Sequence, residues 1–266
     1  MSKNFHRMAG LLVAASLAVA VPVATAGDPA GRYVTKTPIK HVVIIFQENE
    51  SFDHYFGTYP FAKNPAGESR FRALPNSPSV NGLNRGLLNR NPNGAGARPF
   101  RLDPSQNYTC DQTHNYTPEQ QAFDAGLMDK FPQFTGKACS ATTYPSLAQY
   151  GTNVVMGYYD GNTVTALWNY AQYFAMSDNF FDTEFGTTVI GHLNLISGQT
   201  HTTSVQTINN KVANGSVIAN VEAGFDDCVT AATGTPVQMT SQNIGDRLIT
   251  LPRPHRANSR VRAPYV

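Results

Sequence analysis

The sequence predicts an α/β fold, from its length and from two kinds of apolar pattern. The chain has 266 residues, of which 41% are hydrophobic, and this is enough to bury one sizeable core. An apolar, β-branched run at residues 40–46 lies between Pro38 and polar residues that begin at Gln47. Such a run is typical of a buried strand in a parallel sheet. We therefore predict residues 40–46 as the first sheet strand. Apolar residues at helical spacing occur later in the chain, and they predict the helices of the α/β fold.

The first long helix is predicted to begin at Thr117. Thr117 would be its N-cap, a proline follows, and Gln120 would complete a capping box. The apolar face of this helix would carry Phe123, Leu127 and Met128.

The remaining elements follow from local composition. Residues 60–105 are rich in Pro, Gly, Asn and Arg, which predicts a long surface loop. Helices are predicted at 163–175 and 189–195, and 217–221 is a weak strand candidate. Residues 174–181 fit either a strand or a turn.

The N-terminus has the features of an export signal. Lys3 and Arg7 precede an apolar run over residues 8–24, and an Ala-Thr-Ala sequence ends at residue 26, as a signal-peptidase site requires. A single membrane anchor is the alternative, because the run is nearly long enough to span a bilayer. We predict that residues 1–26 are a signal peptide. The mature protein would then be secreted or periplasmic, without stable membrane insertion.

The net charge of +2 hides an uneven distribution of basic residues. Seven of the 20 Lys and Arg lie in the first 26 or the last 20 residues, which leaves 13 basic against 18 acidic residues in the body. Residues 27–246 are therefore acidic overall, which does not fit binding to a nucleic-acid backbone. Residues 247–266 form an Arg/Pro tail that we predict to be disordered, and we favour an aberrant terminus over a natural tail. Residues 243–246 resemble the first turn of a helix that does not continue.

Three cysteines would lie in an oxidising compartment after export. Cys110 and Cys139 would close a loop of about 30 residues, worth roughly 3 kcal/mol if the geometry allows. Cys228 would then remain unpaired, either as a free thiol or with a partner outside this chain.

Polar side chains directly follow the predicted strand. Residues 47–54 combine carboxylates, an amide and an imidazole, at the strand end where open α/β sheets bind ligands. Oxygen donors suit a hard divalent cation. The alternative is a polar turn in which Ser51 or Asp53 caps a helix.

A second candidate site lies at Thr188, in the Phe-Gly-Thr-Thr sequence that precedes a predicted helix. Backbone N–H groups at a helix start stabilise a phosphate or a developing oxyanion. A threonine nucleophile also needs a base or a metal to activate it. An ordinary N-cap is the alternative.

Other catalytic patterns give no comparable signal. The sequence lacks GxGxxG, GxxxxGK[ST], HExxH and GxSxG. The pair Asp226-Asp227 is better explained as a surface turn beside Cys228.

Five long motifs occur in order, at residues 39–57, 110–120, 156–171, 176–181 and 185–200. Together they resemble the bacterial phosphoesterase family, which contains non-haemolytic phospholipases C and AcpA-type acid phosphatases. The resemblance covers about residues 38–246, so we assign 27–246 to the N-terminal part of a phosphoesterase domain.

This resemblance implies an alkaline-phosphatase-like fold, with a mostly parallel sheet flanked by helices. It also implies hydrolysis of a phosphate ester or phospholipid by a hydroxyl nucleophile that is bound to a divalent metal ion. Glu48 and Asn49 match the first metal ligands, and Thr188 matches the nucleophile, which also touches the metal. His114 matches a histidine that faces the phosphoryl group, and His201 is a weaker candidate.

The sequence departs from the family pattern at three places. Gly191 stands where many members have Asn, and Thr187 where many have Pro or Gly. The later Asp-Asp ligand pair has no counterpart, and the family domain normally continues beyond residue 246. The chain therefore resembles a C-terminally truncated member with an incomplete sheet, and Mg²⁺ or Ca²⁺ would be held weakly. An inactive secreted fragment or binding protein is the alternative function.

Overall fold

The computed structural model describes residues 29–32, 34, 36–94, 96–182, 184–221 and 237–250. The chain forms two compact units, residues 1–47 and residues 48–266. The predicted signal peptide, the Asp226-Asp227 pair, Cys228 and residues 251–266 lie outside the described residues.

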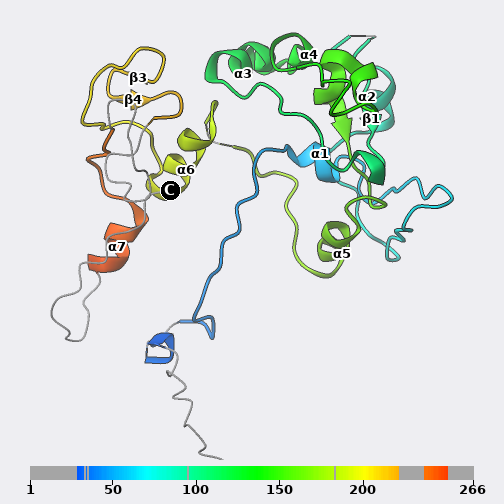
Figure 1. Ribbon diagram of the computed structural model, residues 1–266. Coiled ribbons are helices and arrows are strands. Elements are labelled where there is room, and N and C mark those ends of the chain that lie inside the picture. Colours follow the sequence, from blue (N-terminus) through cyan, green and yellow to red (C-terminus); the bar gives the residue numbers. More distant parts are fainter. Residues whose placement is uncertain are drawn as a thin grey trace, which may run out of the picture. The chain divides into compact units, whose positions relative to one another are not determined.

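Figure 1 follows the elements along the chain. The α-helices are α1 (Phe52–Phe56), α2 (Arg85–Asn89), α3 (Tyr116–Phe123), α4 (Phe131–Phe134), α5 (Thr165–Tyr173), α6 (Thr188–Ser197) and α7 (Ile244–Thr250). The 3₁₀ helices are η1 (Pro29–Arg32), η2 (Pro104–Gln106), η3 (Asp124–Gly126) and η4 (Ala148–Met156). The strands are β1 (Phe100–Arg101), β2 (Gly157–Tyr158), β3 (Val212–Ala213) and β4 (Ser216–Val217).

The strands of the described chain form two small sheets. β1 and β2 pair in parallel, with Phe100 opposite Gly157. β3 and β4 form an antiparallel hairpin around Asn214-Gly215, whose φ angles of 50° and 74° are both positive, as a tight hairpin turn requires. The mixture of helices with parallel and antiparallel strands agrees with the α/β class. The larger parallel sheet flanked by helices is not seen in the described residues.

The strand predicted at residues 40–46 is wrong. These residues belong to no strand, and Val43 and Ile45 are 82% and 85% exposed. A parallel strand needs a neighbour for its backbone N–H and C=O groups and cover for its side chains. Neither is found for residues 42–46 in the described part of the chain.

Apolar side chains of the second unit gather in three clusters. One surrounds Trp168, one lies beside the Cys110–Cys139 disulfide, and one joins α6 to the β3–β4 hairpin. Their buried members are Tyr59, Phe71 and Trp168; Leu102, Cys139, Leu147, Val154 and Tyr159; and Ile190, Val212, Val217 and Val237.

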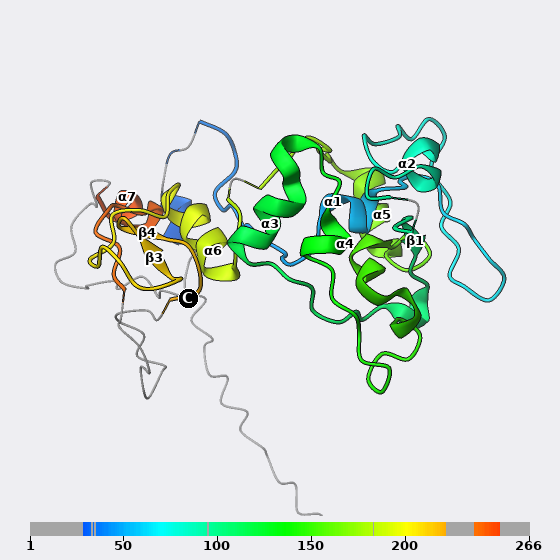
Figure 2. The same cartoon turned by 90° about the horizontal axis from the view of Figure 1, so that it is seen from above.

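The helix predicted from Thr117 exists as α3, but its ends differ. Its N-cap is Asn115, and no side chain caps it, so the predicted capping box is wrong. The chain then turns through left-handed conformations at Asp124 and Ala125, which end the helix before Leu127. The predicted apolar face therefore does not form, and Leu127 and Met128 are exposed. α3 packs beside α4 (Figure 2).

The long surface loop predicted at residues 60–105 is wrong, because this segment contains α2 and β1 and buries Phe71 and Leu102. Two predicted helices and the disulfide agree with the structure. The helices at 163–175 and 189–195 correspond to α5 and α6, and Cys110 and Cys139 form a disulfide with Cα atoms 5.6 Å apart. The weak strand candidate at 217–221 overlaps β4 only at Val217. Residues 174–181 form neither a strand nor a helix.

The segment after residue 243 continues as a helix, contrary to the prediction. The Asn243 Oδ1 accepts from the Asp246 N–H at 3.1 Å, and the Asp246 Oδ2 accepts from the Asn243 N–H at 2.9 Å. This reciprocal cap starts α7, which includes the first four residues of the predicted tail.

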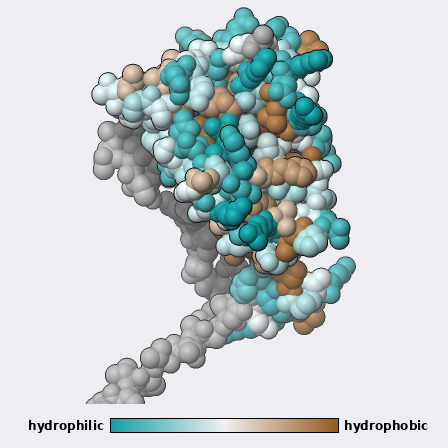
Figure 3. All heavy atoms as spheres, turned by 90° about the vertical axis from the view of Figure 1, so that its right-hand side faces the viewer, coloured by the Kyte–Doolittle hydropathy of each residue, from teal (hydrophilic) through white to brown (hydrophobic). Residues whose placement is uncertain are grey.

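The surface facing the viewer in Figure 3 is mostly hydrophilic, with apolar side chains in small separate patches. The helices of the described residues are too short or too polar to cross a bilayer.

Candidate functional site

Glu48 and Asn49 stand immediately before α1. Ser51 begins this helix, because its Oγ accepts from the His54 N–H at 3.3 Å. The capping alternative considered for residues 47–54 is thus confirmed for Ser51. His54 then ties α1 to β2, since its Nδ1 lies 2.8 Å from the Gly157 carbonyl oxygen.

Thr188 is the first residue of α6, as predicted. The preceding Gly186 has φ +122°, and a Cβ there would lie 2.5 Å from the Ile190 Cδ1, so only glycine fits this turn. Thr187 is the N-cap but does not cap with its side chain. Asn220 serves instead, because its Oδ1 accepts from the Val189 N–H at 3.2 Å. The helix start is therefore held by residues before and after it in the sequence.

The structure brings Glu48 and Thr188 together across 140 residues of sequence. The Thr188 hydroxyl donates to the Glu48 Oε1 at 2.9 Å. This contact brings together two side chains that the family resemblance assigns to one metal site, and their roles as ligand and nucleophile stay predictions. Asn49 is exposed next to Glu48, and in the described part of the chain its side chain makes no hydrogen bond.

His114 lies just before α3. Its Nδ1 is 3.0 Å from the Gln112 carbonyl oxygen and 3.5 Å from the Asp111 Oδ1, and its side chain is 31% exposed. Within the described residues, His114 makes no hydrogen bond or ion pair with Glu48 or Thr188. His201 pairs through its backbone with Ser216 and is exposed.

An acid–base pair of buried His54 and partly exposed Glu50 lies beside the candidate ligands. The Glu50 Oε2 is 3.3 Å from the His54 Nε2. Partial burial raises the pKa of Glu50 to about 7, although 32% of its side chain is exposed. Burial lowers the pKa of His54 to about 4, against a smaller opposite effect of the Gly157 carbonyl. His54 is thus neutral at pH 7, so it adds no positive charge near Glu48.

The donors at Glu48, Asn49 and Thr188 fit a hard divalent cation in type. The 2.9 Å between the Glu48 and Thr188 oxygens also fits two ligands that are each about 2.0–2.6 Å from one ion. Only Glu48 carries a charge. No group of three or more His, Cys, Asp or Glu side chains able to hold a metal occurs among the described residues, so this is at most a partial ligand set.

The model of the Phosphoesterase family matches residues 39–250, which include Glu48, Asn49, His114 and Thr188. The chain belongs to the Phosphoesterase family. The expected membership is thus confirmed.

Curated relatives of this phosphoesterase-family chain are phospholipases C. It is 31% identical to the non-hemolytic phospholipase C of Pseudomonas aeruginosa over 140 residues, which are 48% of this chain and 19% of that protein. It is 27% identical to phospholipase C A of Mycobacterium tuberculosis over 151 residues, which are 54% of this chain and 26% of the relative. The match therefore spans about a fifth to a quarter of these relatives.

Sequence reasoning missed two residues that shape this candidate site. Glu119 accepts from the Gly186 N–H at 2.6 Å, and Asn220, which follows β4 in the sequence, caps α6. Glu119 was visible only as an acid in the first turn of a helix, where a cap or dipole role is the usual explanation. Asn220 carried no local signal.

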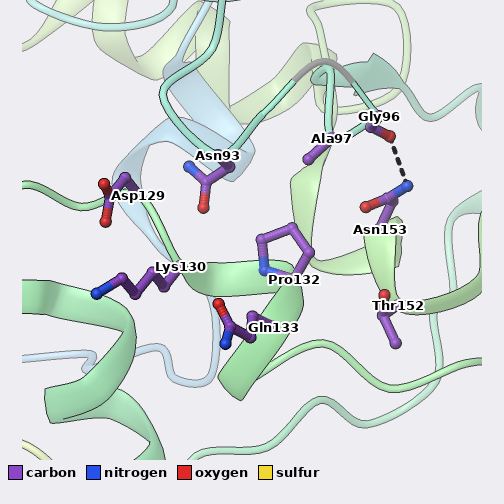
Figure 4. Close-up of a pocket in the computed structure, with 9 residues that line it drawn as sticks. All are labelled: Asn93, Gly96, Ala97, Asp129, Lys130, Pro132, Gln133, Thr152 and Asn153. Carbon is purple, nitrogen blue, oxygen red and sulfur yellow. Dashed lines mark hydrogen bonds between the residues drawn. The ribbon is translucent and has the colours of Figure 1, made fainter.

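A separate cavity of about 340 Å³ lies between α4 and η4. It is lined by polar side chains that include Asn93, Lys130 and Gln133, and Asn153 donates to the Gly96 carbonyl at 2.7 Å on its rim (Figure 4). None of the predicted site residues lines it.

Proposed function

We propose that this chain is an exported phosphoesterase in which Thr188 is the nucleophile. Glu48, Asn49 and Thr188 would hold a divalent cation, and the substrate would be a phospholipid or a smaller phosphate ester. The observation that carries the proposal is the hydrogen bond from the Thr188 hydroxyl to Glu48 at the start of α6.

In this proposal the Thr188 Oγ1 attacks phosphorus and forms a new O–P bond. The P–O bond to the alcohol breaks on the opposite side, and the alcohol leaves with a proton. Water then cleaves the phosphothreonine and restores the hydroxyl. A bound divalent cation would supply the positive charge that favours hydroxyl ionisation and offsets phosphoryl charge.

The protein's own groups contribute in three ways. Glu48 accepts the hydroxyl proton in a hydrogen bond, which orients the Thr188 oxygen. The Thr188 N–H, the first of α6, has no acceptor in the described part of the chain, so it remains available to a phosphoryl oxygen. His114 is proposed to face the same phosphoryl group, from just before the first residue of α3.

A second candidate function is phosphate-ester binding without turnover. The ligand set around Thr188 favours it, because a single carboxylate is present there and no larger metal-binding cluster occurs in the described residues. Weak metal binding would leave the hydroxyl largely protonated at neutral pH.

Hydrolysis of p-nitrophenyl phosphate and of p-nitrophenyl phosphorylcholine, with Mg²⁺, Ca²⁺ or Zn²⁺ and with EDTA, separates the two functions. Turnover that EDTA removes, that Thr188→Ala abolishes and that Thr188→Ser retains in part supports the nucleophile. Thr142→Ala is the matched control, since Thr142 is exposed in the loop after the disulfide, and it should keep full activity. Absence of turnover with every metal, together with measurable binding of either ester, would instead support the binding function.

A further inference from the structure

The turn that leads into Thr188 is held by one face of α3. The Glu119 Oε2 accepts from the Gly186 N–H at 2.6 Å. One turn further along α3, the Phe123 ring lies 5.4 Å from the Phe185 ring, measured between centroids. A polar contact and an aromatic contact therefore fix two successive residues of the turn from the same helix.

The position of this turn sets the position of the Thr188 hydroxyl. Gly186 is two residues before Thr188 and has a left-handed backbone that only glycine adopts readily. The Thr187 side chain gives no cap, because its Oγ1 is buried without a hydrogen-bond partner among the described residues. Asn220 caps the first turn at Val189 instead, and Glu119 is the acceptor that restrains the segment before Thr188.

Glu119 is suited to this task by charge and by surroundings. A carboxylate accepts more strongly from an N–H than a neutral oxygen does. Burial raises the pKa of Glu119, while the Gly186 N–H and the charge of His114 oppose this effect. α3 thus carries a link to the Thr188 turn, and it begins next to His114.

We propose that Glu119 is a positioning residue for the Thr188 nucleophile. It acts through Gly186 and does not touch the substrate. This inference rests on the proposed function for the role of Thr188, but the restraint itself is independent of turnover. Misplacement of a nucleophile by about 1 Å lowers the rate by about 100-fold, so loss of the restraint should lower kcat by about 10- to 100-fold and leave KM nearly unchanged.

Three variants test it in the full chain. Glu119→Ala removes the acceptor, Glu119→Gln keeps an oxygen at the same distance, and Gln121→Ala changes an exposed residue of the same helix. Each is assayed for kcat and KM with p-nitrophenyl phosphate and for amide hydrogen exchange at Gly186, by NMR of protein labelled with ¹⁵N-glycine. We expect faster exchange and low kcat in Glu119→Ala, recovery of most of both in Glu119→Gln, and no change in Gln121→Ala.

The outcomes separate this inference from the proposed function. Wild-type kcat and unchanged Gly186 exchange in Glu119→Ala would overturn the inference. A fall in kcat that Glu119→Gln does not restore, with the same fall in thermal stability, would also overturn it, since a general folding role would be responsible. If the wild-type chain shows no turnover, the proposed nucleophile fails, and unchanged Gly186 exchange would still refute the restraint.

Discussion

Residues 42–46 and residues 154–159 have similar apolar character but opposite environments. The first stretch is Val-Val-Ile-Ile-Phe and the second is Val-Val-Met-Gly-Tyr-Tyr. In the first, the four aliphatic side chains are 72–85% exposed, whereas Val154 and Tyr159 are 3% and 5% exposed. Local hydrophobicity therefore does not decide burial in this chain.

The difference lies in what each backbone finds to bind. The Tyr158 carbonyl accepts from the Leu102 N–H at 2.7 Å, and the Tyr159 N–H donates to the His54 carbonyl at 2.7 Å. The Tyr159 hydroxyl reaches the Gln106 carbonyl at 3.1 Å. Residues 42–46 have no such partners in the described chain. An apolar segment is buried only where its polar backbone is also satisfied.

Among variants that should still fold, the largest effect is expected in the buried cluster around Trp168. Trp168 is fully buried, packs edge-on against Tyr59 and Phe71, and donates its Nε1 proton to the Tyr55 carbonyl at 2.7 Å. Trp168→Ala should lower the free energy of unfolding by about 3–5 kcal/mol, measured by urea denaturation. Tyr170→Ala, on the exposed face of the same helix, should change it by less than about 0.5 kcal/mol. Equal effects of the two variants would contradict the assignment of this core.

The disulfide in the cluster that contains Val154 and Tyr159 should have the next largest effect. Cys110 and Cys139 are 29 residues apart and join the cluster that includes Val154 and Tyr159. Replacing both with serine should lower the free energy of unfolding by about 3 kcal/mol, because the unfolded chain regains the freedom of the loop. Urea denaturation with and without dithiothreitol measures this. Loss of stability on reduction of the double variant would show that another thiol contributes.

A pH dependence is expected from His54, which attaches α1 to the buried stretch, and from its neighbour Glu50. His54 has a pKa of about 4 in the folded chain against an ordinary 6.5, so its contribution to stability is lost as pH falls from 6.5 to 4. Glu50 has a pKa of about 7 against an ordinary 4.5, so its contribution is present below pH 4.5 and lost as pH rises to 7. The two slopes oppose each other between pH 4.5 and 6.5.

Single variants should expose each slope. In the metal-free protein, Glu50→Gln should lose stability as pH falls below 6.5. His54→Asn should be less stable than the wild type at pH 7 and should gain stability as pH falls. The wild-type protein should change less than either variant over the same range. Urea denaturation at half-unit pH steps measures the three curves. Parallel curves would contradict the opposed pH dependences expected from Glu50 and His54.

Much of the helical structure could be predicted from the sequence, but less of the sheet. α5 and α6 have local patterns that suffice, and Thr188 was placed correctly at the start of α6. Residues 42–46 also have a strong local pattern, yet a strand depends on distant neighbours. The β3–β4 hairpin was overlooked although Asn214-Gly215 is a strong local turn signal.

The candidate site shows the same division. The pairing of Glu48 with Thr188 could be predicted because both lie in long family motifs. The Glu119–Gly186 contact joins residues 67 positions apart, and neither one carries a motif that names the other. Asn49 and His114 remain predictions, since neither side chain hydrogen-bonds to the side chain of Glu48 or Thr188 in the described chain.

The smallest effect on stability is expected in the exposed stretch. Val43→Lys and Ile45→Lys place charges where the side chains are already in water, so each should change the free energy of unfolding by less than about 0.5 kcal/mol. Val154→Lys, the matched change in the buried stretch, should prevent stable folding because it buries an unpaired charge.

The same exposed stretch favours association between chains, because it is uncharged and β-branched and its backbone groups are unpaired in the described chain. Val43→Lys and Ile45→Lys should therefore reduce light scattering at high concentration. Strong destabilisation by Val43→Lys, measured by urea denaturation, would show that residues 42–46 are covered in solution and would reinstate the predicted strand.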